Sequence, residues 1–263
     1  MNKESLRIKV PKGVEDLVLD AVSKHNETIG NFLLDNVHRS LYGTENLEEA
    51  KRHLKEGSIL FYFNHFAKLD PILYGQIIRD YLNPSQDEKK PLEHVAGITS
   101  LRHIDPEKGF LSAVQAELIE GWSETFGINA IPVIQTKDKK DYPQADSFNR
   151  NAVIEAARFL RQQGNVLAIS PEGTRSTLNE LLEAEEGFEV LFKLGGKKVL
   201  ALPAAGVHGT IRPYNTKTKV SVGKPFSFEE IQRESQDKGE SITELAMQRL
   251  AALLPEQNRG YYL

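Results

Sequence analysis

The sequence predicts an α/β fold with a mixed, largely parallel sheet, helices on both faces of that sheet and an N-terminal helical segment. From about residue 50 onward, short apolar runs alternate with stretches of helical character, which is the pattern of βα units around a parallel sheet. Before that point, apolar residues recur at helical spacing over 14–41, which predicts one or two amphipathic helices. We therefore expect one compact unit, with a helical segment over 1–50 and an α/β domain over 51–263.

Short apolar runs, each bounded by turn or charged residues, are typical of strands in such a sheet. The predicted strands are 58–63, 94–99, 130–134, 166–170, 199–207 and 219–223. Helices fill most of the gaps between them. Asp70-Pro71 and Asp105-Pro106 each place a proline after an aspartate that can serve as an N-cap, which predicts that helices begin at these two points.

The composition excludes several classes of function. The 263 residues include no cysteine, which excludes thiol nucleophiles, thiolate metal sites and disulfides. The formal net charge of -4 argues against a nucleic-acid-binding protein, because affinity for a phosphate backbone usually shows as a basic excess. No apolar run approaches the roughly 18 residues of a membrane span, and the N-terminus lacks the apolar core of a signal peptide. We expect a cytoplasmic protein, either soluble or peripherally associated with a membrane.

A histidine and an aspartate follow the first predicted strand. His65 comes just after 58–63, and Asp70 lies five residues later, where a helix is predicted to begin. Because ligands collect at the carboxyl ends of strands in open α/β sheets, this is a favourable place for chemistry. If the loop folds back, Asp70 accepts a hydrogen bond from Nδ1 of His65 and leaves Nε2 free as a general base. The spacing alone is weak evidence, since Asp70 is also fully explained as an N-cap.

A second polar cluster follows the predicted strand at 166–170. The segment at 171–176 reads PEGTRS. Its hydrogen-bond donors are the side chains of Thr174, Arg175 and Ser176. Such a cluster suits a phosphate or another oxyanion, because an arginine binds two oxygens at once and hydroxyls take the remainder. Gly173 permits a tight backbone, and Glu172 offers an acceptor for a substrate hydroxyl. The alternative is an ordinary turn in which Arg175 is simply solvated.

Together the two segments resemble the glycerolipid acyltransferase family, which includes the lysophosphatidate and glycerol-3-phosphate acyltransferases. In that family an NHxxxxD block carries the general base and its aspartate, and an EGTRS block helps to bind the acceptor. The matching residues here are Asn64, His65 and Asp70, followed by Glu172, Gly173, Thr174, Arg175 and Ser176. Downstream, VLALPAAGVHG around Pro203 is similar to the family's apolar fourth block, and VSVGKPF over 220–226 resembles the strand that follows it. The resemblance covers roughly residues 54–226.

The resemblance implies an O-acyltransferase whose acyltransferase domain lies within 51–263. An acyl group would move from acyl-CoA or an acyl-carrier protein to a hydroxyl of a glycerol-phosphate acceptor, either glycerol 3-phosphate or 1-acylglycerol 3-phosphate, in phospholipid biosynthesis. The thioester is a co-substrate, and no cofactor is implied. The expected partners are the thioester donor, a lipid acceptor and a membrane surface. Three alternatives stay open: another lipid or alcohol as acceptor, a non-catalytic lipid-binding relative, and a thioesterase that uses the same base on water.

One block departs from the family's pattern. The family commonly has an arginine, which contacts the acceptor phosphate, after an Ile-Pro-Val-like strand. Here Ile131-Pro132-Val133 is present, but Gln135 occupies the expected arginine position. Lys137 lies two residues further on and could replace the arginine as a point charge, without its planar fork. The alternative is a solvated lysine within a charged run.

Other kinds of active site find little support. The sequence has no G-x-S-x-G segment of an α/β-hydrolase. It also has no histidine and carboxylate spacing typical of a metal site, so we expect no metal. His103 and His208 lie near predicted strand ends, where a lone histidine is usually structural or solvated. The helical region over 14–41 could dock on a membrane or shape an acyl tunnel, but its mixed charges favour packing on the core.

Overall fold

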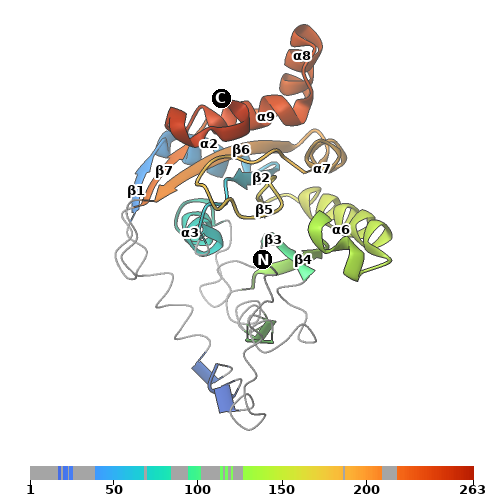
Figure 1. Ribbon diagram of the computed structural model, residues 1–263. Coiled ribbons are helices and arrows are strands. Elements are labelled where there is room, and N and C mark those ends of the chain that lie inside the picture. The colour runs from blue at the N-terminus through green and yellow to red at the C-terminus, as the bar shows by residue number, and fades with distance from the viewer. Residues whose placement is uncertain are drawn as a thin grey trace.

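The computed structural model describes residues 17–18, 20–22, 24–25, 39–67, 70–83, 94–101, 113–114, 116–117, 120, 127–185, 187–208 and 218–263 (Figure 1). The strands are β1 (Arg39–Tyr42), β2 (Ser58–Phe63), β3 (Val95–Ser100), β4 (Asn129–Val133), β5 (Val166–Ile169), β6 (Val199–His208), β7 (Thr218–Val222) and β8 (Phe226–Ser227). The α-helices are α2 (Thr44–His53), α3 (Asp70–Ile77), α6 (Ala145–Leu160), α7 (Phe188–Gly195), α8 (Phe228–Lys238) and α9 (Ile242–Ala251). Shorter helical turns are η1 (Ile78–Leu82), η3 (Thr136–Asp141), η4 (Glu256–Asn258) and η5 (Gly260–Tyr262).

Within the described residues the strands form one sheet in the order β1-β7-β6-β2-β5-β3-β4, with β8 paired to β6. Every pairing is parallel except those that β6 makes with β7 and β8. The fold is therefore α/β with a mixed, largely parallel sheet, as the sequence predicts. The six predicted strands coincide with β2 to β7 to within one residue at each end.

Strand β1 differs from the prediction, because helical periodicity was expected to continue through residue 41. The structure instead pairs Leu41 with Val220 in a parallel arrangement with β7. A four-residue strand is too short to show a period-two pattern, so the pairing with β7 decides its conformation. Residues 17–18, 20–22 and 24–25 are helical, and the rest of 1–38 lies outside the described residues. Strand β1 places residues 39–42 in the same sheet as the α/β domain.

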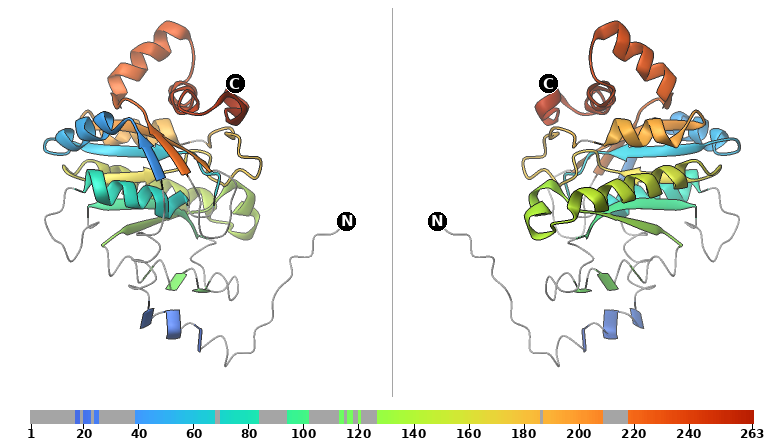
Figure 2. Two further views of the ribbon diagram at one scale, coloured as in Figure 1. Left: turned by 90° about the vertical axis from the view of Figure 1, so that its left-hand side faces the viewer. Right: turned by 90° about the vertical axis from the view of Figure 1, so that its right-hand side faces the viewer.

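The centre of the sheet is β2, in which all six residues are buried. Its side chains alternate between the two faces, as the pleat of a strand requires. Leu60 and Tyr62 pack in a core that includes residues of α6, α7 and α9, whereas Ile59, Phe61 and Phe63 pack in a core with residues of α2 and α3. The predicted helices on both faces are thus confirmed. Figure 2 shows α3 in front of the sheet in one view and α6 in front of it in the opposite view.

The topology brings four chain segments to one edge of the sheet. Strands β2, β4, β5 and β6 run in the same direction through a chain of parallel pairings, so the segments that follow them meet at their shared carboxyl edge. Strand β7 is antiparallel to β6, which brings its first residue, Thr218, opposite His208 at the end of β6. The residues after β2 and β5, where the sequence places its two motifs, therefore lie at the same edge.

Helix α3 begins at Asp70, as predicted, whereas the predicted helix start at Asp105 lies outside the described residues. Among the helices that the structure describes, none is both long enough and apolar enough to cross a membrane.

Candidate active site

Asn64, the residue directly after β2, ties the start of the site to the neighbouring strand. Its side-chain amide donates to the carbonyl of Gly206 (2.9 Å), and its oxygen accepts from the amide of Gly206 (2.7 Å) and from the hydroxyl of Tyr74 (3.0 Å). The asparagine is completely buried, so these hydrogen bonds satisfy groups that water does not reach. They fix the backbone immediately before His65 against β6 and α3.

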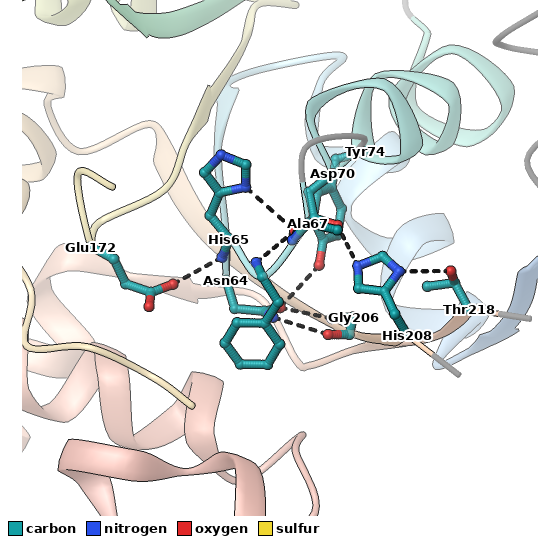
Figure 3. A network of polar contacts seen from close by, with 10 residues as sticks. Asn64, His65, Ala67, Asp70, Tyr74, Glu172, Gly206, His208 and Thr218 are labelled. Atoms are coloured by element: carbon teal, nitrogen blue, oxygen red, sulfur yellow. Dashed lines mark hydrogen bonds and ion pairs between the residues drawn. The ribbon is translucent and has the colours of Figure 1, made fainter. Parts of the chain in front are cut away.

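His65 and Asp70 form the contact that their spacing predicts (Figure 3). The Nδ1 atom of His65 lies 3.3 Å from Oδ2 of Asp70. The same oxygen accepts from the backbone amides of Phe66 and Ala67, each at 2.7 Å. The carboxylate therefore turns back onto the loop that carries the histidine and closes this loop, while its backbone begins α3. The N-cap explanation of Asp70 does not account for these three contacts.

The Asp70 carboxylate is nearly inaccessible, with 1% of its side chain exposed. Burial by itself would raise its pKa, but the hydrogen bonds from His208 and His65, the charge on His208 and the amide of Ala67 outweigh that effect and hold the pKa of Asp70 below its usual value. Asp70 is consequently ionised at neutral pH. An ionised partner on Nδ1 fixes the histidine tautomer that carries its proton there.

The opposite side of the His65 ring is accessible. The side chain is 23% exposed, and within the described residues Nε2 has no hydrogen-bond partner. Neither a serine nor a threonine hydroxyl of the described chain forms a hydrogen bond with the ring. Nε2 is therefore available to take a proton from a group that arrives from outside the protein.

Glu172 joins the two motif segments through backbone amides. One carboxyl oxygen accepts from the amide of His65 and the other from the amide of Leu182, both at 2.9 Å. The side chain is 1% exposed. Burial raises the pKa of Glu172 to about 7, the charge of Asp70 adds to the rise, and the two amides partly oppose it. With both oxygens occupied, this geometry favours a structural role over the contact with a substrate hydroxyl that the sequence suggested.

Ser176 makes a further link between the segments. Its backbone amide donates to the carbonyl of His65 (2.9 Å), and its buried hydroxyl accepts from the amides of Leu178 and Glu180. Gly173 takes a positive φ of 62°, which glycine adopts without strain, and a Cβ at this position would meet Glu185 at 2.7 Å. These two residues therefore shape the PEGTRS turn from within.

Four polar side chains lie on or against the surface of this turn. Lys137 donates to the hydroxyl of Thr174 (2.9 Å), and Gln135 donates through its amide to the carbonyl of Gly173. Arg175 is partly buried, and its guanidinium forms no hydrogen bond or ion pair within the described chain. The residue that occupies the family's arginine position thus anchors the PEGTRS backbone, and the lysine two residues later places a positive charge on the same turn.

His208 is the residue that sequence reasoning missed. Its Nε2 lies 2.5 Å from Oδ1 of Asp70, and its Nδ1 lies 3.0 Å from the hydroxyl of Thr218. It was interpreted as structural or solvated because a lone histidine usually is. The available signal was its place at the end of a strand parallel to β2, which predicts the same edge of the sheet. His103 lies outside the described residues.

These contacts form a polar network around one accessible imidazole. Its chemistry is that of a general base oriented by a buried carboxylate, next to donors that suit an anion. Within the described residues, no group of three or more metal-ligating side chains comes together.

Comparison with known proteins adds one structural similarity. No protein-family model matches the sequence, and no curated protein matches it. Among solved structures, the chain is similar to the 1-acyl-sn-glycerophosphate (LPA) acyltransferase PlsC from Thermotoga maritima, at 17% sequence identity and a TM-score of 0.44, over 90% of this chain and 83% of that chain. A likeness of this size carries no weight on function.

Proposed function

We propose that this protein is an O-acyltransferase that moves an acyl group from a thioester to a hydroxyl of a glycerol-phosphate acceptor. The observation that carries the proposal is the imidazole of His65, which binds a buried, ionised Asp70 through Nδ1 and presents an unengaged Nε2. Such an arrangement is the base half of a catalytic triad. This base can abstract a proton from a nucleophile, but the nucleophile itself has to come from another group.

The substrate hydroxyl supplies that nucleophile. The chain contains no cysteine, and the Ser176 hydroxyl accepts two backbone amides instead of contacting His65. A covalent acyl-enzyme on a residue of the described chain therefore has no support in the geometry. Direct attack by an acceptor hydroxyl on the thioester requires only the base, and the family resemblance of the NHxxxxD and EGTRS segments points to the same reaction.

The proposed reaction proceeds through a tetrahedral intermediate. The acceptor oxygen bonds to the thioester carbonyl carbon while Nε2 of His65 takes the hydroxyl proton. The Asp70 carboxylate stabilises the imidazolium that results. When the intermediate collapses, the carbon–sulfur bond breaks and the imidazolium returns its proton to the departing sulfur. The products are an ester and the free thiol of coenzyme A or an acyl-carrier protein.

The acceptor's anionic group is assigned to the surface of the PEGTRS turn. Arg175 offers a fork of donors, Thr174 offers a hydroxyl, and Lys137 adds a positive charge through its contact with that hydroxyl. Glu172, Gly173 and Ser176 act from below the surface, where they hold the turn against the His65 loop. This division favours a phosphorylated acceptor over a neutral alcohol.

An acceptor screen with a labelled acyl thioester tests the proposal. Free thiol and lipid products are measured with palmitoyl-CoA or palmitoyl-acyl-carrier protein and one acceptor at a time: glycerol 3-phosphate, 1-acylglycerol 3-phosphate, glycerol or a long-chain alcohol. The proposal predicts that thiol release depends on a phosphorylated acceptor and matches ester formation one to one. Equal thiol release without any acceptor would indicate a thioesterase. Displacement of bound acyl-CoA by acceptor without thiol release would indicate a lipid-binding protein.

A further inference from the structure

We propose that His208 is a positioning residue of this site, which holds the Asp70 carboxylate in the orientation that serves His65. The proposal rests on the proposed function, since it assigns His65 as the base. Its basis is a chain of contacts across three elements. Thr218 of β7 contacts Nδ1 of His208, and Nε2 of His208 contacts Oδ1 of Asp70, whose other oxygen faces His65 (Figure 3).

The two oxygens of Asp70 are held very differently. Oδ2 accepts from His65 and from the amides of Phe66 and Ala67, whereas within the described residues Oδ1 has His208 as its recorded partner. The torsion that rotates a carboxylate has a broad, shallow profile, so the plane of the group depends on a hydrogen bond to each oxygen. Without His208, Oδ1 would be a buried charged oxygen with no hydrogen-bond partner among the described residues, which is unfavourable. The carboxylate would then be free to rotate away from the geometry that His65 needs.

The tautomer of His208 follows from its neighbours. The ionised Asp70 requires a proton on Nε2 of His208, so in the neutral ring Nδ1 is an acceptor and takes the hydroxyl proton of Thr218. The side chain of His208 is 9% exposed, and Thr218 is also buried. Since β6 and β7 pair His208 directly with Thr218, the sheet itself sets this contact. His65 and His208 should therefore carry their protons on opposite ring nitrogens, Nδ1 and Nε2 respectively.

His208 also influences how the site responds to pH. Among the described residues, the titratable group bound to His208 is Asp70 of α3. Asp70 in turn interacts with His65 and Tyr74, while the exposed Lys219 of β7 alternates to the face opposite Thr218. Tyr74 stays neutral because burial holds its pKa well above the usual value. The His208 hydrogen bond helps to keep the pKa of Asp70 low. Its removal should raise that pKa.

Ring-nitrogen NMR on the 15N-histidine-labelled full chain tests the positioning without relying on turnover. We expect His65 as a single Nδ1–H tautomer and His208 as a single Nε2–H tautomer in the wild type. In the His208→Leu variant the His65 signals should shift toward the average of two tautomers, because Asp70 is no longer fixed. An unprotonated Nε2 on His208 in the wild type, or unchanged His65 nitrogen signals in the variant, would overturn the proposal. Since these spectra need no substrate, they separate its failure from a failure of the proposed acyl transfer.

Kinetics of matched variants provide the second test. His208→Leu should lower kcat by about 10- to 100-fold, as expected for a hydrogen bond to a charged group, with both KM values within about threefold. His208→Gln should recover most of the activity, because its amide N–H reaches the place of Nε2. A folded His208→Gln variant that recovers none of the activity lost in His208→Leu would indicate a merely structural residue and overturn the proposal.

Variants of Thr218 keep the test decisive if His208→Leu does not fold. Valine preserves the shape of threonine and its preference for a strand but removes the hydroxyl, and serine retains the hydroxyl. Thr218→Val should lower kcat about two- to fivefold, while Thr218→Ser should lose less because it keeps the hydroxyl. Identical kcat values for Thr218→Val and the wild type would contradict the role assigned to the Thr218 contact.

Discussion

Replacement of Asp70 by asparagine removes the charge from the site while leaving its hydrogen-bond framework almost intact. The amide oxygen can take the place of Oδ2 and accept from Phe66, Ala67 and His65. The amide nitrogen then faces His208, whose ring can accept that N–H at Nε2 if its own proton moves to Nδ1, where it donates to Thr218. We therefore expect Asp70→Asn to fold with a melting temperature close to that of the wild type.

The expected loss of activity follows from the distance between the two side chains. A carboxylate and an imidazolium at 3.3 Å attract each other by about 5 kcal/mol at an effective dielectric constant of about 20. The imidazolium exists only as the acceptor hydroxyl loses its proton, so the attraction stabilises the transition state and not the bound substrates. At about 1.4 kcal/mol for each factor of ten, kcat should fall between about 10³- and 10⁴-fold, with little change in either KM.

The assay is acceptor-dependent thiol release at saturating concentrations of thioester and acceptor, together with a thermal melt of each variant. Asp146→Asn serves as the control, because it changes the same functional group on a side chain that is exposed at the surface of α6 and bound to Lys139. The control should retain wild-type kcat. A folded Asp70→Asn variant whose kcat lies within tenfold of the wild type would refute the role of Asp70 as the charged partner of His65.

Two further predictions concern the turn that follows β5. The pKa of Glu172 is about 7 in the fold against an ordinary value of 4.5, so the folded state binds more protons than the unfolded state between these pH values. The free energy of unfolding should therefore fall by roughly 3 kcal/mol from pH 4.5 to 7. Denaturant titrations should show this fall in the wild type and not in Glu172→Gln, and the same pH dependence in both proteins would refute it. Arg175→Ala should raise KM for a phosphorylated acceptor by about 10-fold or more, as expected for a charge-assisted contact, while KM for a neutral alcohol stays constant; steady-state kinetics with equal changes for both acceptors would exclude the anion-binding role.

The sequence was sufficient for strands β2 to β7, because the central ones are short and mostly apolar runs. All six residues of β2 are buried, and a run of that kind between turn residues is recognisable without knowledge of its neighbours. Strand β1 was not predicted, because its conformation depends on the pairing of Leu41 with Val220. Local periodicity carries no information about a partner so distant along the chain.

Contacts of the site that are local in sequence could also be predicted, whereas contacts between distant segments could not. His65 and Asp70 are five residues apart, so their contact can be predicted from a loop that folds back on itself. The contact between Asp70 and His208 spans 138 residues, and only the order of strands in the sheet brings the two together. Glu172 was assigned to the acceptor because it belongs to the EGTRS segment and offers an acceptor for a substrate hydroxyl. Its burial under backbone amides of His65 and Leu182 emerges only when both segments are packed.

Acceptor-dependent thiol release by His65→Ala tests the central claim most directly. His53→Ala is the matched control, because His53 lies in α2 and contacts the carbonyl of Lys198, the residue before β6. Thermal melts first establish that both variants are folded. Loss of the general base should then lower kcat on the best acceptor by about 10²- to 10⁴-fold, while the control retains the wild-type rate. A His65→Ala protein that transfers the acyl group at a rate near that of the wild type would contradict the account.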